Sequence, residues 1–426
     1  MLTRPISRLM RSIGMTGPLP ARMPSKADAA DARQYIRGYW PSLRRDQPDD
    51  RSDLIGLPYP YLVSSYAPDH DFDFNEMYYW DSYMIAQGLM NSGHPGDQEL
   101  VEGMLENLLH MVRRFGLVPN GSRTYMMSRS QPPFLTSYIL EVYHAYSKDD
   151  AWLAERIEVA KREYEHVWMG KRKPHARQVY KGLSRNYSTD MTHDQAELES
   201  GWDYTPRFQR HSLDYLPVDL NALLYKYEVD FSVAAGILGN LSEVAHWHHM
   251  ANKRKRMMNK LMWDRRRGLF YDYDYVHKRR SPVSSLAAYY CLWAGLTTRS
   301  QAAAMVLALR RFEHPGGLTA TDDIPFPQRF IGGLPTQWAY PNGWAPLHWL
   351  VIRGLDRSGH RRDARRLAAK WLRTNLEWYG RHGNFLEKYN VVEPGRPPAS
   401  GVYPSQTGFG WTNAIFERLC RDYIDR

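Results

Sequence analysis

Apolar residues recur at intervals of three and four through most of this 426-residue chain, the spacing that puts them on one face of an α-helix. Strand signals are few, and the clearest runs from Leu269 to Tyr273. The pattern therefore predicts an all-α protein. Predicted helices cover residues 77–92, 97–115, 132–147, 150–168, 217–235, 241–263, 281–296, 299–312, 343–355, 358–379 and 407–424, with a further one near 31–46.

Loops rich in glycine, proline and aromatic residues separate successive pairs of these helices, at 117–123, 186–207, 334–344 and 385–410. Helical hairpins divided by such loops at fairly regular intervals predict hairpins arranged around a ring. No proline- or serine-rich linker divides the chain after residue 50. We therefore expect residues 47–426 to form a single domain with one shared core.

The positive charge is concentrated at the N-terminus. Residues 1–46 hold nine basic and three acidic side chains, and so account for +6 of the formal net charge of +10. This segment is also rich in proline, alanine and glycine, and we expect it to be a flexible or loosely docked extension. The rest of the chain is nearly balanced, and the run Lys253–Arg256 fits a solvated helix face, so nucleic acid is not expected as a partner.

Several other classes of protein are disfavoured. No window approaches 18 consecutive apolar residues, so we expect no membrane span. The basic N-terminus lacks the apolar stretch of a secretory signal, which favours a cytoplasmic location. Cys291 and Cys420 cannot make a disulfide framework or a four-cysteine zinc site. His246, His248 and His249 do not share the helix face that metal ligands need, so no metal or other cofactor is expected.

Six loops combine a tryptophan or phenylalanine with a carboxylate, amide or guanidinium in a bend that contains glycine. Amides and carboxylates hydrogen-bond hydroxyl groups, while aromatic faces cover the C–H surface of a sugar ring. The 14 tryptophans and 29 tyrosines supply such faces, although an ordinary large core uses them too. Together the loops indicate a carbohydrate site.

Two carboxylates are the natural candidates for acid and base. The neighbouring Trp202 would reduce the solvation of Asp203 and raise its pKa, as a general acid requires. Glu387 lies in a separate loop, and an inverting glycosidase would need the pair about 6.5–9.5 Å apart, with water between them. The alternative is that Asp203 caps a helix while Glu387 pairs with Lys388 at the surface.

The chain resembles the trehalase family of glycoside hydrolases. The family signature PGGRF-x-E-x-YYWDSY corresponds to residues 73–83, DFNEMYYWDSY, and QWDAPNGWAP corresponds to residues 337–346, QWAYPNGWAP. ESGWD, NRSQPP (here SRSQPP), VDLN, EKY and GFGWTN also match in the family's order, so the resemblance covers about residues 54–420.

This resemblance implies an (α/α)6 barrel of six helical hairpins and the inverting hydrolysis of an α-glucoside, with trehalose as the first candidate. It implies that Asp203 is the general acid and Glu387 the general base. We expect Trp344 and Trp411 to form walls of the site together with Trp80 and Trp202. The residues that it implies for the sugar site are Phe74, Trp80, Asp81, Asn120, Arg129, Gln131, Arg185, Gly201 and Trp202.

Four positions depart from the family pattern. Asp73 replaces an arginine, Val402 replaces a glutamate, Tyr187 falls near another glutamate, and Ala339 replaces an aspartate. Reversing a charge would oppose a site built for the same hydroxyl pattern, so hydrolysis is better supported than trehalose itself. Two alternatives stay open: hydrolysis of a different α-glucoside with a small acidic or polyol aglycone, and a sugar-binding protein without activity.

Overall fold

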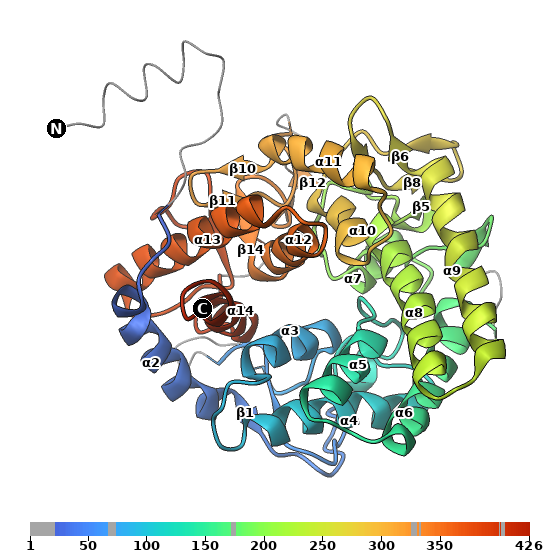
Figure 1. Ribbon diagram of the computed structural model, residues 1–426, viewed down its shortest axis with the longest axis horizontal. Helices are drawn as coiled ribbons and strands as arrows, with labels where there is room; N and C mark the ends of the chain where they lie inside the picture. The colour runs from blue at the N-terminus through green and yellow to red at the C-terminus, as the bar shows by residue number, and fades with distance from the viewer. Residues whose placement is uncertain are drawn as a thin grey trace.

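The computed structural model describes residues 22–66, 74–171, 176–324, 330–331, 334–399, 401 and 405–426. Figure 1 shows its long helices in two concentric layers around a central axis. The inner layer contains α3 (Tyr79–Leu89), α5 (Leu135–Ala145), α8 (Val218–Ile237), α10 (Tyr290–Trp293), α12 (Ala345–Arg357) and α14 (Gly410–Tyr423). The outer layer contains α2 (Lys26–Leu43), α4 (Asp97–Phe115), α6 (Asp150–Glu163), α9 (Leu241–Leu261), α11 (Arg299–Ala308) and α13 (Arg361–His382).

The residue pattern of each helix explains its layer. Every residue of α3 is buried, because this inner helix packs against α14, α4 and the centre of the ring. In α13, by contrast, Leu367, Trp371 and Leu372 are buried while arginines fill the outer face. Inner and outer helices alternate along the chain, and α3 contacts α14 to close the ring. The fold is therefore the expected (α/α)6 barrel, and its main apolar cluster is continuous through the two layers.

The expectation of a loosely docked segment up to residue 46 is wrong for α2. Ser25 and Asp28 form a capping box that starts this helix. Ala29, Ala32 and Ile36 are buried where α2 packs against α13 and α14, so the helix completes the sixth hairpin with the C-terminal α14. Within α2, Arg37 is exposed, whereas Arg33 forms an ion pair with Glu417 of α14. Residues 1–21 lie outside the described part of the chain.

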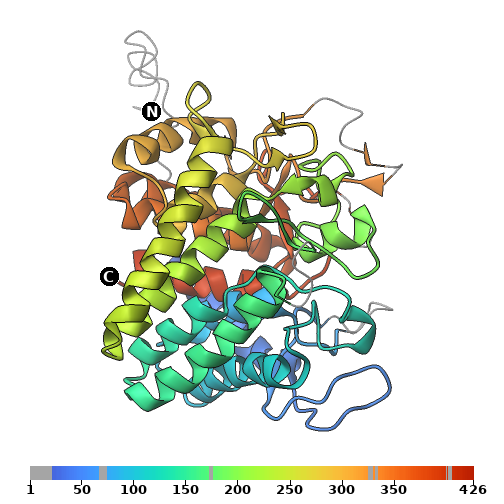
Figure 2. The ribbon, with the colours of Figure 1, turned by 90° about the vertical axis from the view of Figure 1, so that its right-hand side faces the viewer.

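Short strands and helical turns occupy the loops. Figure 2 shows most of them gathered at one end of the barrel, at the right-hand side of the view. The strands are β1 (Arg44–Arg45), β2 (Tyr61–Leu62), β3 (Gln178–Tyr180), β4 (Leu183–Ser184), β5 (Tyr215–Leu216), β6 (Trp263–Asp264), β7 (Leu269–Phe270), β8 (Tyr273–Asp274), β9 (Arg279–Arg280), β10 (Glu313–His314), β11 (Gly317–Leu318), β12 (Phe330–Ile331), β13 (Leu334–Pro335), β14 (Asn342–Trp344) and β15 (Lys388–Asn390). The short helices are α7 (His193–Glu199), the π-helix η2 (Tyr164–Trp168) and the 3₁₀ turns η1 (Thr124–Met126), η3 (Ser212–Asp214), η4 (Leu286–Tyr289) and η5 (Leu309–Arg311).

All these strand pairs are antiparallel. In the described residues β5, β8 and β9 form the only three-stranded sheet, and the other strands pair two by two. The pair β14–β15 matters most for the site, because it aligns Trp344 with Lys388 and Gly343 with Tyr389.

Two sequence predictions differ from the structure in extent. The helix expected over 281–296 is limited to η4 and α10, because Ser281 and Leu286 donate their backbone N–H groups to Asp272 and Ala320 instead. The strand expected over 269–273 is divided into β7 and the start of β8. Asp272, between the two, uses its side chain to bind another loop.

Helix α2 should contribute to stability through Ile36, which is 1% exposed. We expect Ile36→Ala to lower the free energy of unfolding by about 2–4 kcal/mol, because it leaves a cavity against α13 and α14. Denaturant unfolding followed by circular dichroism measures this change. Gln34→Ala, at an exposed position of the same helix, is the control and should change stability by less than about 0.5 kcal/mol. An Ile36→Ala protein as stable as the control would mean that α2 does not pack this way in solution.

Candidate active site

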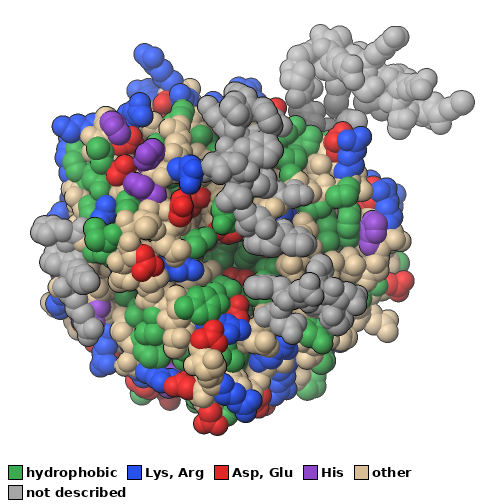
Figure 3. Space-filling model, turned by 180° about the vertical axis from the view of Figure 1, so that it is seen from behind, with side chains coloured by type: hydrophobic (Ala, Val, Ile, Leu, Met, Phe, Trp, Pro, Cys, Tyr) green, Lys and Arg blue, Asp and Glu red, His purple; other side chains and the backbone are tan. Residues whose placement is uncertain are grey.

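The predicted site residues come from the starts of inner helices and from the loops before them. Asp81 lies in the first turn of α3, Trp411 in the first turn of α14, and Trp344 is the N-cap of α12. Asp203 follows α7, and Glu387 precedes β15. Figure 3 shows the loop-bearing face with a hollow near its centre, where hydrophobic and acidic side chains lie at depth.

Three carboxylates, Asp81, Asp203 and Glu387, influence one another across this site. Burial, with a contribution from the charge of Glu387, raises the pKa of Asp203 to about 6. Burial also raises the pKa of Asp81 to about 7, and the charges of Glu387 and Asp203 add to the rise. Charges act on one another in this way only at short range in a poorly solvated region. The geometry agrees, because Trp338 donates to Asp203, Trp411 donates to the carbonyl of Glu387, and the two indole centroids are 6.2 Å apart.

Asp203 is held by two donors from one distant loop. Trp338 donates its indole N–H to Oδ1 at 3.1 Å, and Gln337 donates its amide N–H to Oδ2. The aspartate lies in the turn after α7, so it is not the helix cap of the alternative reading. Because both donors favour the ionised carboxylate, they limit the rise in pKa that burial and Glu387 produce.

Glu387 has a different environment from Asp203. It is 2% exposed and forms an ion pair with Lys388, whose Nζ lies 2.6 Å from Oε2. The alternative reading placed this pair at the surface, but both side chains are buried. The backbone of Glu387 is also fixed, because its carbonyl accepts the indole N–H of Trp411 at 3.2 Å. The two candidate catalytic groups thus have chemically distinct partners.

Five tryptophans form a connected aromatic cluster beside the carboxylates. The rings of Trp338 and Trp344 stack face to face with centroids 3.7 Å apart. Trp202 and Trp80 lie 5.3 and 5.6 Å from Trp338, and Trp411 lies 5.5 Å from Trp80 at a steep angle. Four of these side chains were predicted for the site from the sequence, whereas Trp338, which joins them, was not.

The polar residues predicted for the sugar site are buried and tied to the same loops. Gln131 accepts the backbone N–H of Trp80 at 3.2 Å, and Asn120 donates to the carbonyl of Ser130 at 2.9 Å. Arg129 donates to the side chain of Gln195 at 2.8 Å, while its buried Nε has no partner among the described residues.

Glycine is needed at position 201, where φ is +72° and a Cβ would lie 3.1 Å from both Trp80 and Pro132. This close approach places Trp80 next to the turn that carries Asp203.

Two other residues predicted for the sugar site, Phe74 and Arg185, mainly contact other protein groups. Phe74 packs its ring against Tyr78 and Phe409, with centroids 6.1 and 6.3 Å away. Arg185 donates to the carbonyls of Ala176 and Leu213 and to the hydroxyl of Tyr275, so its guanidinium is occupied by protein groups. Asp73 and Val402, the two departures of greatest interest, lie outside the described residues.

Several residues near the carboxylates were not predicted. Gln337 and Trp338 bind Asp203, Lys388 binds Glu387, and Ser64 donates to Asp81 at 2.7 Å. Gln337, Trp338 and Lys388 stand inside matched family motifs, which was a usable signal. Ser64 has no such signal, because only the fold brings it to α3.

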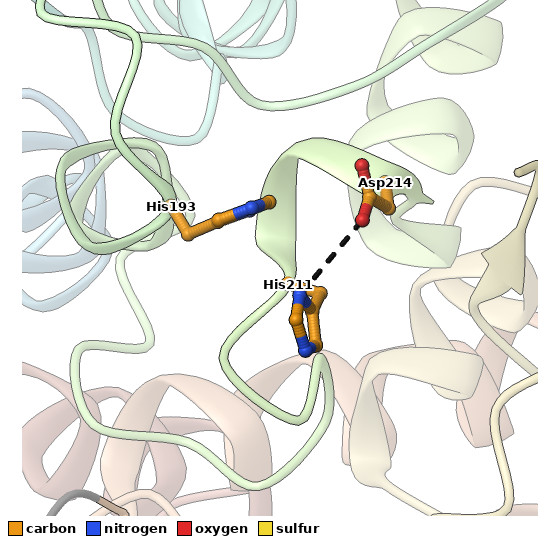
Figure 4. Close-up of side chains that lie close together, drawn as sticks. All are labelled: His193, His211 and Asp214. Carbon is orange, nitrogen blue, oxygen red and sulfur yellow. Dashed lines mark ion pairs between the residues drawn. The ribbon is translucent and has the colours of Figure 1, made fainter.

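One cluster has the composition of a metal site. His193, His211 and Asp214 offer ligand atoms within 4.8 Å of one another, and Figure 4 shows them between α7 and η3. The backbone N–H of Leu213 donates to Nδ1 of His193 at 3.2 Å, which leaves the proton of the neutral ring on Nε2. A metal would have to displace that hydrogen bond. We therefore describe the cluster as a polar link between α7 and η3, with an ion-pair distance of 3.9 Å between His211 and Asp214.

Comparison with known proteins agrees with this geometry. The family model described as trehalase matches residues 21–200 and 176–423. The chain belongs to the trehalase family. Human trehalase is 33% identical over an alignment 419 positions long, which covers 88% of this chain and 69% of the human protein. The chain is therefore that of a glycosidase.

Solved structures agree with this assignment. The neutral trehalase of Saccharomyces cerevisiae superposes with a TM-score of 0.72 at 30% identity, covering 85% of this chain and 73% of the yeast chain. A mannosylglycerate hydrolase of Thermus thermophilus shares the fold, with a TM-score of 0.65 at 17% identity over 91% of this chain and 99% of the other. No helix in the described part of the chain is long and apolar enough to span a bilayer.

The raised pKa of Asp203 should reduce stability at high pH. The carboxyl has a pKa of about 6 in the fold and about 4 when unfolded. Its contribution to stability is therefore complete below about pH 4 and is lost as the pH rises through about 6. We expect Asp203→Asn, relative to wild type, to gain roughly 1–3 kcal/mol between about pH 4.5 and pH 8.

Denaturant unfolding at the two pH values measures this gain. Asp194→Asn, at an exposed position of α7, is the matched control and should show no such change. If the two variants behaved alike, Asp203 would not be desolvated as the structure has it.

Proposed function

We propose that this protein hydrolyses α,α-trehalose to two glucose molecules with inversion at the attacked carbon. The observation that carries the proposal is the electrostatic coupling of Asp203 and Glu387, whose partners differ in the way that an acid and a base require. Burial raises the pKa of Asp203 to about 6, while Glu387 is held in an ion pair with Lys388. Membership of the trehalase family supports the choice of substrate.

In the proposed reaction, the protonated carboxyl of Asp203 gives its proton to the glycosidic oxygen as the bond from C1 to that oxygen breaks. The carboxylate of Glu387 takes a proton from a water molecule, which attacks C1 from the opposite face. The products are one β-glucose from the attacked ring and one α-glucose as leaving group. Asp203 is then ionised and Glu387 protonated, and exchange with solvent resets the pair.

The remaining predicted residues would hold the sugar. Trp80, Trp202, Trp344 and Trp411 supply apolar faces for its C–H surface. Asp81, Asn120, Gln131 and Arg129 would bind hydroxyl groups, with Phe74, Gly201 and Arg185 shaping the site. Removal of water from this cluster would strengthen each of these polar contacts.

We also propose a cytoplasmic location. Cys291 and Cys420 are both unpaired and buried, as is usual for proteins of reducing compartments. Recovery of the protein from the medium or the periplasm in cell fractionation would contradict this.

Removing either carboxylate should abolish most activity on trehalose. Because each supplies a proton transfer, we expect Asp203→Asn and Glu387→Gln each to lower kcat by about 10²–10⁴ or more, with a smaller effect on KM. Proton NMR of the wild-type reaction should show α- and β-glucose appearing in equal amounts before mutarotation.

Asp149→Asn, which alters a helix cap remote from the site, is the control and should keep normal turnover. Near-normal turnover by Asp203→Asn would refute its role, and release of α-glucose alone would refute inversion.

A second candidate substrate is an α-glucoside with an acidic aglycone. Arg129 and Arg177 each have a buried Nε without a partner among the described residues, and both lie near Glu199 in the loops behind the sugar site. Arg177 is paired with Glu199, whereas Arg129 has no carboxylate partner among the described residues, and its charge favours an acceptor such as a carboxylate.

A panel of α-glucosides assayed for glucose release separates the two substrates. We expect trehalose to have the highest kcat/KM. A glucoside of a small hydroxy acid should have a kcat/KM at least about 10-fold lower, because its aglycone lacks most of the contacts that the second glucose ring would make. The reverse order would establish the second candidate. Binding of trehalose by calorimetry without any hydrolysis would instead support a sugar-binding protein.

A further inference from the structure

The turn that carries Asp203 is in an unfavourable backbone conformation. Gly201 has φ of +72° and Tyr204 has φ of +58°, so both neighbours of the Trp202–Asp203 pair are left-handed. Glycine adopts that conformation freely, but a tyrosine does not. Such a turn persists only where the surrounding structure determines it.

Arg207 supplies a rigid connection from this turn to the barrel. Its side chain is completely buried and binds two carboxylates. The guanidinium donates to Asp219 at 2.6 and 2.8 Å and to Asp272 at 2.8 and 3.0 Å. Asp219 is in the first turn of α8, and Asp272 lies between β7 and β8. A planar fork with two bidentate partners leaves Arg207 almost no freedom.

The same guanidinium contacts the aromatic cluster that reaches Asp203. Its Cζ lies 4.5 Å from the ring of Trp202. Trp202 lies 5.3 Å from Trp338, and Trp338 donates to Asp203 Oδ1 at 3.1 Å. The intervening Thr205 is also fixed, because its N–H donates to Glu197 at 3.0 Å. Arg207 is thus linked to the Asp203 carboxyl both along the backbone and through two neighbouring indoles, which are tilted to each other by 33°.

This arrangement gives a role to the VDLN motif, residues 218–221, which the proposed chemistry does not use. Asp219 holds Arg207, while Asn221 exchanges two hydrogen bonds with the backbone of Ser184, at 2.8 and 2.9 Å, ahead of Arg185. The first turn of α8 therefore fixes two loops of the site at once.

We propose that Arg207, held between Asp219 and Asp272, is a positioning residue for the general acid. It fixes the 201–207 turn and the Trp202 ring so that the Asp203 carboxyl meets the glycosidic oxygen. The inference rests on the proposed role of Asp203. Arg207 itself does not touch the substrate, and its loss should impair proton donation while binding and water activation are retained.

A comparison of two substrates tests this role. Trehalose needs protonation of its leaving group, whereas fluoride leaves α-glucosyl fluoride with little help from an acid. We expect Arg207→Met to lower kcat on trehalose at least about 10-fold more than on α-glucosyl fluoride, with KM little changed. Arg207→Lys, which keeps the charge but loses the fork, should fall between this variant and wild type.

Arg254→Met is the matched control, since Arg254 is another buried arginine, paired with Glu228 at 2.9 Å and without contact to the Asp203 turn. It should change both substrates by the same factor. Equal losses on the two substrates for Arg207→Met would overturn the proposal.

If that variant does not fold, Asp272→Asn carries the test, because it leaves Arg207 paired with Asp219. We again expect kcat to fall more on trehalose than on α-glucosyl fluoride, and equal losses on the two substrates would again overturn the proposal.

Asp203→Asn in the same assay separates this inference from the proposed function. It should lose trehalose hydrolysis and keep most activity on α-glucosyl fluoride. If Asp203→Asn keeps activity on trehalose, the proposed function fails. If it behaves as expected while Arg207→Met shows no bias between the substrates, only the positioning role fails.

Discussion

The repulsion between Asp203 and Glu387 is the constraint on which the rest of the site depends. Two carboxylates in a poorly solvated region cannot both be ionised without cost, so one of them has a raised affinity for its proton. Which of the two carboxyl groups keeps the proton is determined by their different hydrogen-bond and ion-pair partners. Asp203 receives neutral N–H donors from Gln337 and Trp338, while Glu387 receives the ammonium of Lys388. An acid and a base result from a difference in surroundings rather than in residue chemistry.

Holding such a pair in place requires a stiff frame, and the barrel supplies one. The inner helices are largely buried, α3 along its whole length, and α2 closes the outer layer against α14. Because the groups of the site stand at the starts of inner helices or in loops bonded to them, their separation is set by helix packing. The stacked Trp338 and Trp344 extend this rigidity into the site itself. Loops alone would let two repelling carboxylates move apart.

Helical periodicity predicted the barrel well, because each helix has a clear apolar face or is apolar throughout. At α2 the periodicity indicated a helix near residues 31–46, and the error came from composition and charge, which suggested a mobile tail although Ala29, Ala32 and Ile36 follow the helical spacing. Periodicity overestimated α10, because backbone groups of Ser281 and Leu286 pair with distant segments. Those partners belong to tertiary structure, which local pattern does not contain.

Candidate catalytic residues could be chosen from the sequence because their motifs are distinctive. Their partners were harder to choose. Trp338 and Gln337 meet Asp203 across more than 130 residues, and a burial argument from Trp202 alone gives the direction of the Asp203 pKa without the donors that limit it. Arg207 was missed for a related reason, since a lone arginine has no signal until two distant aspartates surround it.

The altered family positions can change specificity without disturbing the acid and base. Tyr187 donates its N–H to Glu199, and the guanidinium groups of Arg177 and Arg185 lie 5.4 and 5.7 Å from its ring. Glu199 also accepts the N–H of Ser130 at 2.9 Å, next to Arg129. A change at Tyr187 is thereby transmitted to the loop proposed to bind sugar hydroxyls, whereas Asp203 is fixed separately through Trp338 and Arg207. Sugar recognition and proton transfer are thus supported by different contacts, which lets one vary while the other is retained.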